Sequence, residues 1–132
     1  MTGARREEFR VPGQPAPFSH YTEAVRADDL LFVSGVVPID AEGRLVGGDD
    51  VTEQARQVFR NMAAILAVAG ATIADVVKVT VFLTRIDDRE AVDVARREAF
   101  GAVRPASTLV EISKLVVPGA YVEIEAVALL GR

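Results

Sequence analysis

The chain has 132 residues, half of them hydrophobic, which is enough for one domain with a substantial core. A formal net charge of −4, with no Lys/Arg cluster longer than a pair, argues against nucleic acid as a partner. The absence of cysteine excludes disulfides and thiolate chemistry, and a single histidine, His20, argues against a histidine zinc site.

The N-terminal residues carry charge and are not followed by an apolar segment of signal-peptide type. No apolar run is long enough to cross a bilayer, so we expect a cytoplasmic protein with no membrane partner. Residues 1–19 are rich in proline and glycine, which favours an extended, weakly ordered lead-in. A single domain over residues 20–132 is expected to follow.

Residues 21–27 and 30–37 read as two strands of a hairpin with a turn at Asp28 and Asp29, closed by a second turn from Pro38 to Gly43. A short strand or loop is expected around Leu45. These residues open the domain with antiparallel structure.

Residues 50–70 carry the signals of an amphipathic helix. Asp50 and Glu53 have capping-box spacing, apolar residues recur at helical spacing after them, and Gly70 ends the pattern. Residues 75–84 then read as a strand. Alternation predicts one face with Lys78 and Thr80, and the opposite, apolar face with Val77, Val79, Val81 and Leu83.

A second helix is expected from the capping-box spacing of Asp87 and Glu90 to about Gly101, with a weaker apolar stripe. Residues 104–130 read as two further strands joined by a Pro-Gly turn. In the last strand, alternation places Glu123 and Glu125 on one face and an apolar set on the other: Val122, Ile124, Ala126 and Ala128.

The order β-β-(β)-α-β-α-β-β suits an α+β fold in which both helices cover one face of a mixed sheet. The other face stays uncovered within one chain and is expected to carry polar residues among apolar ones: Thr80, Thr108, Glu111, Glu123 and Glu125. Association with copies of the same chain would cover it, and symmetric homo-oligomers are common.

Phosphate-binding loops, dinucleotide glycine fingerprints, serine-hydrolase elbows and metal-ligand clusters are absent from the sequence. Glu123 has two readings: a carboxylate that activates water, or a strand residue that pairs with Lys78 or Lys114. Ser34 either ends a strand or offers its hydroxyl and turn amides to an anion. Tyr21 either packs or covers a pocket, and Arg104 either reaches a carboxylate or stays exposed.

Several motifs in one order resemble the Rid family of imine and enamine deaminases, also called the YjgF or L-PSP family. The matching stretches are Tyr21-Thr-Glu-Ala-Val, Phe32-Val-Ser-Gly-Val-Val-Pro38, Val76-Val-Lys-Val-Thr-Val-Phe-Leu83, Pro105-Ala106 and Val122-Glu-Ile-Glu-Ala126. The resemblance implies a chorismate-mutase-like fold, a homotrimer with clefts between subunits, and hydrolysis of small imino or enamino acids without metal or cofactor. It also implies that Glu123 positions water and that Tyr21 and Ser34 shape the pocket.

Two positions depart from the family pattern. Ser107, which is followed by Thr108, stands where the family has an arginine that holds the substrate carboxylate. Asp93 stands where the family has an asparagine. A serine hydroxyl cannot replace the charge of a bidentate arginine.

The sequence therefore favours a cofactor-free hydrolase of imines, enamines or related small C–N compounds, other than a simple 2-imino acid deaminase. Two alternatives stay open. One is a trimeric small-molecule binding or protective protein without turnover, and the weaker one is an endoribonuclease or translation inhibitor, against which the acidic balance counts.

Overall fold

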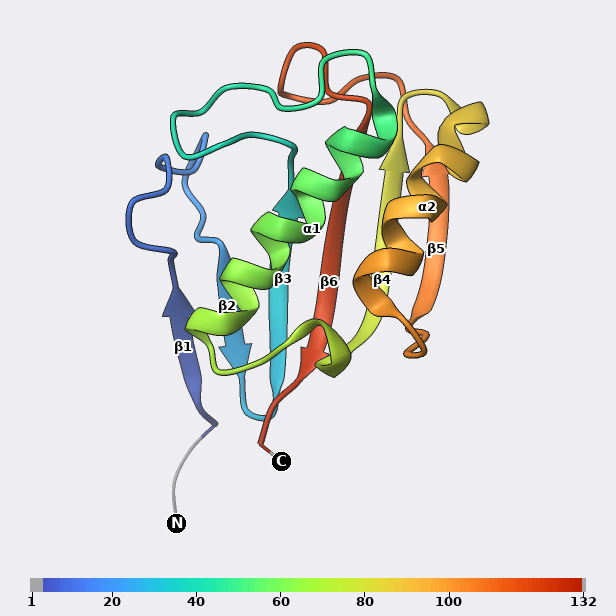
Figure 1. Ribbon diagram of the computed structural model, residues 1–132. Helices are drawn as coiled ribbons and strands as arrows, with labels where there is room; N and C mark the ends of the chain where they lie inside the picture. Colours follow the sequence, from blue (N-terminus) through green and yellow to red (C-terminus); the bar gives the residue numbers. More distant parts are fainter. Residues whose placement is uncertain (1–3, 132) are drawn as a thin grey trace.

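The computed structural model describes residues 4–131, which form one six-stranded sheet and two α-helices (Figure 1). The strands follow the spatial order β1-β2-β3-β6-β4-β5. Their bounds are β1 Arg6–Phe9, β2 Ala24–Ala27, β3 Leu30–Val36, β4 Val76–Leu83, β5 Ala106–Glu111 and β6 Val122–Leu129. The helices are α1 Val51–Val68 and α2 Arg89–Phe100. Two short 3₁₀ turns accompany them: η1 Ile73–Asp75 lies between α1 and β4, and η2 Ile86–Asp88 directly precedes α2.

Both helices lie on the same face of the sheet, so the predicted α+β architecture with a mixed sheet is confirmed (Figure 1). The β2–β3 hairpin is also as predicted, with antiparallel pairing across the turn at Asp28. Around Leu45 the structure has an isolated bridge to Ile39 and no strand. Within the described residues, no helix is long and apolar enough to span a membrane.

Helix α1 begins as its sequence predicts. The side chain of Asp50 accepts a hydrogen bond from the backbone N–H of Glu53 at 3.1 Å, which satisfies a donor of the first turn. The expected N-cap of the second helix is wrong, because residues 86–88 form η2 and α2 starts at Arg89. Asp88 pairs with Arg85 at 2.8 Å and makes no side-chain cap.

Two expectations for the strands are wrong. The segment 104–130 is no hairpin, since β6 pairs antiparallel with both β3 and β4, while β5 pairs parallel with β4 on its far side. The connection through residues 112–121 is long enough to cross β4, so adjacency in sequence did not impose adjacency in the sheet. Residues 6–9 of the expected weakly ordered lead-in form β1, an edge strand paired with β2.

The face of Val77 was also predicted wrongly. The register of β4 against β6 shifts between Val76 and Lys78, so Val76 is buried and Val77 is 44% exposed. Glu111 was expected on the open face, but it pairs in register with the buried Leu83 and accepts a hydrogen bond from the N–H of Ile86. In β6 the prediction holds: Val122, Ile124, Ala126 and Ala128 are buried.

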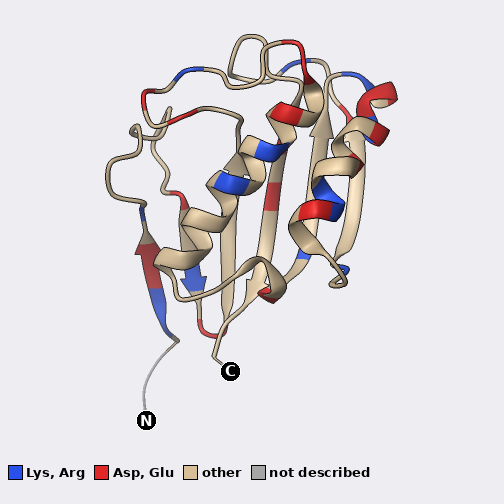
Figure 2. Ribbon diagram, in the orientation of Figure 1, with Lys and Arg blue, Asp and Glu red and all other residues tan. Residues whose placement is uncertain are grey.

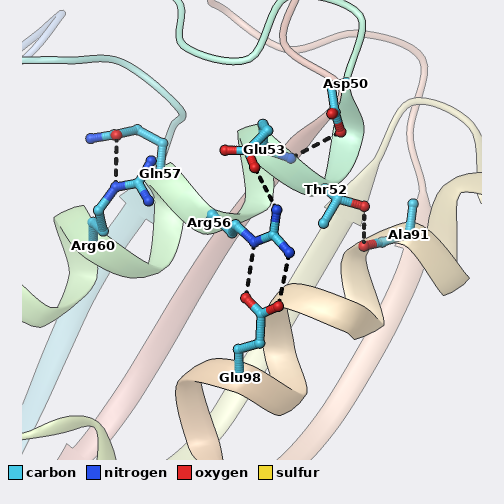
Figure 3. Close-up of polar contacts among 8 residues, drawn as sticks. All are labelled: Asp50, Thr52, Glu53, Arg56, Gln57, Arg60, Ala91 and Glu98. Carbon is cyan, nitrogen blue, oxygen red and sulfur yellow. Dashed lines mark hydrogen bonds and ion pairs between the residues drawn. The ribbon is translucent and has the colours of Figure 1, made fainter.

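Direct contacts join the two helices (Figure 3). The guanidinium of Arg56 donates to both carboxylate oxygens of Glu98 at 2.9 and 2.8 Å and also pairs with Glu53. These bonds raise the pKa of Arg56 and lower that of Glu98. The hydroxyl of Thr52 donates to the carbonyl of Ala91 at 2.8 Å. These contacts hold α2 against α1, and so over β4 and β5.

Candidate active site

Glu123 projects from β6 on the face that the helices leave open. Its neighbour in register on β4 is Phe82, and the residues before and after it in β6 are buried in the core. Within residues 4–131 its carboxylate has no hydrogen bond or ion pair, so pairing with Lys78 or Lys114 is not observed. Burial, and to a lesser extent the charge of Glu125, raise the pKa of Glu123.

A bulge in β3 leaves space for the carboxylate of Glu123. Val33 pairs with Ala126 and Val36 with Ile124, so two residues of β3, Ser34 and Gly35, lie opposite one residue of β6. A Cβ atom added to Gly35 would lie 2.2 Å from Oε2 of Glu123. The side chain of Glu123 therefore occupies the space that any other residue at position 35 would fill. Sequence reasoning did not single out Gly35, although a glycine inside a strand pattern is a signal of a bulge or a close approach.

Ser34 lies in the bulge of β3, and Tyr21 lies in the loop that leads into β2. The hydroxyl of Ser34 donates to the carbonyl of Thr22 at 2.6 Å and its N–H donates to the carbonyl of Glu23, so within one chain both groups have backbone partners. The hydroxyl of Tyr21 accepts a hydrogen bond from the N–H of Phe18 at 3.3 Å.

Tyr21, Ser34 and Gly35 line a small, mostly apolar pocket of about 80 Å³. Residues 11–18, the end of β3 and α1 complete its walls. Asn61 of α1 fixes one wall by donating to the carbonyls of Val37 and Ile39 at 3.0 and 2.8 Å. The pocket can hold only a small group beside the strand that seats Glu123.

Four predicted site residues lie elsewhere in the chain. Thr108, on the open face of β5, accepts a hydrogen bond from Nζ of Lys78 at 2.7 Å. Ser107 pairs in register with buried Val79, so it belongs to the helix-covered side of β5. The remaining two are Asp93 on α2, paired with Arg97, and Arg104 in the exposed turn before β5.

One chain therefore places Tyr21 and Ser34 on one pocket, and Glu123 beside Gly35 of that pocket's lining, but it leaves the residues of α2 and β5 apart from them. Strand β4 separates β5 from β6, which amounts to about 10 Å between strand axes. Among the residues that the structure describes, no group of three or more His, Cys, Asp or Glu side chains is placed to hold a metal ion.

Known proteins resemble the chain over almost its whole length. The family model for Endoribonuclease L-PSP matches residues 12–130. The chain is 37% identical over 132 residues to the 2-iminobutanoate/2-iminopropanoate deaminase of Homo sapiens, which covers 99% of this chain and 95% of that protein. It is 35% identical over 123 residues to the 3-aminoacrylate deaminase RutC of Acinetobacter baylyi, which covers 92% of this chain and 97% of that protein.

Among solved structures, RidA from the Antarctic bacterium Psychrobacter sp. PAMC 21119 is similar with a TM-score of 0.87 and 30% identity. The likeness covers 94% of this chain and 99% of that one. These matches include every strand of the sheet from β2 onward and both helices.

Proposed function

The chain belongs to the L-PSP family, which includes the Rid and RutC deaminases, and on that premise we propose that it hydrolyses a small imine or enamine. The observation that carries the proposal is Glu123. A partly buried carboxylate without a partner is costly in a fold, and its raised pKa makes it a stronger proton acceptor than an ordinary glutamate.

In the proposed reaction Glu123 takes a proton from a water molecule while the water oxygen bonds to the imine carbon. The electrons of the C=N π bond move to nitrogen, which takes a proton from solvent, and a carbinolamine forms. Glu123 then returns its proton to the nitrogen, the C–N bond breaks and ammonia leaves, and the hydroxyl group gives its proton to solvent to leave a carbonyl group. Water and one proton-transferring group suffice, so the proposal includes no cofactor.

Ser107 bears on the choice of substrate. Its hydroxyl cannot supply the charge that would hold a carboxylate from β5, and a charge-assisted hydrogen bond contributes roughly 1.5–3 kcal/mol. We therefore propose that a simple 2-imino acid is not the preferred substrate. The pocket of about 80 Å³ beside Gly35 favours a compound with a small apolar substituent.

The proposal includes assembly into a homotrimer with the site between neighbouring subunits. Apolar residues of the open sheet face support self-association, since Leu30, Phe32 and Leu129 are 38%, 47% and 41% exposed in one chain. A cleft between copies would also explain why the predicted site residues fall into two separate groups.

The test is the decay of 2-iminopropanoate and 2-aminoacrylate, generated by a coupled amino-acid oxidase or lyase and followed in the presence of the purified protein. Glu123→Gln should lower kcat by about 100-fold or more, because a positioned general base contributes about 10²–10⁴-fold. Ser107→Arg should increase kcat/KM toward these two compounds, because it restores a carboxylate-binding charge.

Gly35→Ala tests the same site through its geometry, because its Cβ would displace the carboxylate of Glu123. It should lower kcat with little change in KM. Wild-type activity that Glu123→Gln leaves intact would refute this site. If neither wild type nor Ser107→Arg shows turnover on any imine or enamine tested, the protein is the non-catalytic binder.

A further inference from the structure

A second concave region lies on the opposite side of the sheet from Glu123, between α2 and β5. Its volume is about 340 Å³, within the range of about 300–1,000 Å³ that is typical of small-molecule sites. Six residues of α2 line this α2 groove together with Leu109 of β5: Arg89, Glu90, Val92, Asp93, Arg96 and Arg97. Three arginines face two carboxylates there, so the groove is net positive.

Two of its arginines have no partner. Arg97 pairs with Asp93 at 2.9 Å, but within residues 4–131 neither Arg89 nor Arg96 makes a hydrogen bond or ion pair through its side chain. Arg96 is nevertheless partly buried. The aliphatic stem of Arg96 can pack against the groove while its guanidinium stays free to bind an anion.

Arg89 lies at an electrostatically unfavourable position of its helix. It is the first residue of α2, where the helix dipole is positive and a cation is unfavourable by about 0.3–1 kcal/mol. The nearest carboxylate in sequence, Asp88, is already paired with Arg85. An anion bound in the groove would offset the repulsion at Arg89 and provide Arg96 with its missing partner.

The groove also adjoins the strand face of Ser107. α2 leads through a turn into β5, which runs back along it (Figure 1). Leu109, which lines the groove, follows Ser107 by two residues in β5 and therefore lies on the same face of that strand. The charge absent from β5 at Ser107 is therefore present on the neighbouring helix.

We propose that the α2 groove binds a small carboxylate, whose oxygens accept hydrogen bonds from Arg89 and Arg96. Asp93 does not compete strongly for these arginines, because Arg97 compensates its charge. The proposal rests on the proposed function only for the source of the carboxylate, which is either the substrate or a separate small acid. In the first case α2, and not β5, anchors the substrate in the cleft between subunits.

The binding test uses pyruvate as the probe, titrated into the full-length protein at low ionic strength and followed by calorimetry and by NMR of the arginine Nε–H groups. Wild type should bind with perturbed Arg89 and Arg96 signals. Arg96→Gln and Arg89→Gln should each weaken binding by about tenfold, because each removes a charge-assisted bond, and Arg96→Lys should recover part of the loss. Arg44→Gln, which removes an exposed arginine in a distant turn, is the matched control and should change the affinity less than twofold.

Kinetic measurements on the imine that the wild type consumes show whether the bound carboxylate belongs to the substrate or to a separate acid. A higher KM with unchanged kcat in Arg96→Gln assigns the groove to the substrate carboxylate, whereas unchanged KM with lost pyruvate binding assigns it to a separate acid. Glu123→Gln should still bind pyruvate. Loss of turnover in Glu123→Gln therefore tests the proposed function, and loss of pyruvate binding in Arg96→Gln tests the groove separately. No pyruvate binding by wild type, or equal binding by the Arg89→Gln/Arg96→Gln double variant, overturns the proposal.

Discussion

Burial of Glu123 links the candidate site to stability at the scale of a single residue. Its pKa in the fold is raised above the ordinary value of 4.5, first by burial and then by Glu125. A group of this kind contributes stability that is fully present below its unfolded pKa and is lost as pH rises through the raised folded pKa. Ionisation of Glu123 as the pH rises therefore weakens the fold.

We accordingly expect Glu123→Gln to raise Tm at pH 7.5, with the gain disappearing near pH 4, where the wild-type carboxyl is protonated. Thermal unfolding at the two pH values checks it. Glu42→Gln, in an exposed turn, serves as the control and should leave Tm unchanged at both. An equal gain for Glu123→Gln at both pH values would show that the effect does not come from ionisation.

At the scale of single residues, the sequence predicted the face on which Glu123 lies but not the contacts that its side chain makes. Alternation in β6 was enough to place Glu123 opposite the core, because neighbouring strand residues point to opposite faces. The sequence did not indicate that Gly35 leaves space for the carboxylate of Glu123, because this close approach joins residues 88 positions apart in the chain. Likewise, the hydroxyl of Ser34 is used by the carbonyl of Thr22, a pairing that only the β2–β3 register produces.

At the scale of elements, a buried amide joins α1 to the loop that leads into β6. Gln54 is fully buried, and its Nε2 donates to the carbonyls of Gly48 and Gly119 at 2.7 and 2.9 Å. Its Oε1 accepts from the N–H of Tyr121 at 2.8 Å. This side chain holds Tyr121, the residue directly before β6 and two residues before Glu123.

Gln54→Leu should lower the free energy of unfolding by roughly 2–5 kcal/mol, because it leaves three backbone groups without partners in a buried place. Urea denaturation measures the change. Ala63→Gln alters an exposed position of the same helix and should cost less than about 0.5 kcal/mol. A similar small cost for Gln54→Leu would mean that water satisfies the three groups and that Gln54 does not fix β6.

The elements themselves were largely predictable, since apolar periodicity and the Asp50 cap are local signals. The errors have non-local causes. The bulge of β4 between Val76 and Lys78 arises from its pairing with β6, and it reverses the expected exposure of Val77. The position of β5 beyond β4 depends on which sheet edge is free after β6 has paired with β3 and β4.

At the scale of the whole molecule, the face of the sheet opposite the helices is left uncovered in one chain (Figure 1). It combines exposed Leu30, Phe32 and Leu129 with polar residues at its centre, among them Lys78 and Glu125. Charged residues are concentrated on the helices, the loops and edge strand β1, and the central strands carry few of them, Lys78 in β4 and Glu123 and Glu125 in β6 (Figure 2). An apolar face with few charges favours burial against copies of the same chain.

We expect a trimeric mass for the wild type in light scattering at micromolar concentration. Phe32→Asp should shift it toward the monomer, because it would bury a carboxylate at the contact. Val116→Asp changes a 72% exposed loop residue and should leave the trimer intact. A monomeric wild type would refute the interface, and with it the cleft in which the two groups of site residues are proposed to meet.

The sequence by itself determined the kinds of element, the buried face of β6, the α+β class and the position of Glu123, because these follow from local periodicity and from short motifs. Only the tertiary structure decided the strand order, the close approach of the Glu123 side chain to Gly35 and the separation of Ser107 from Glu123 by β4. It also revealed the unpaired Arg89 and Arg96 beside β5. Such features depend on backbone pairing and side-chain packing between distant segments, which local patterns do not specify.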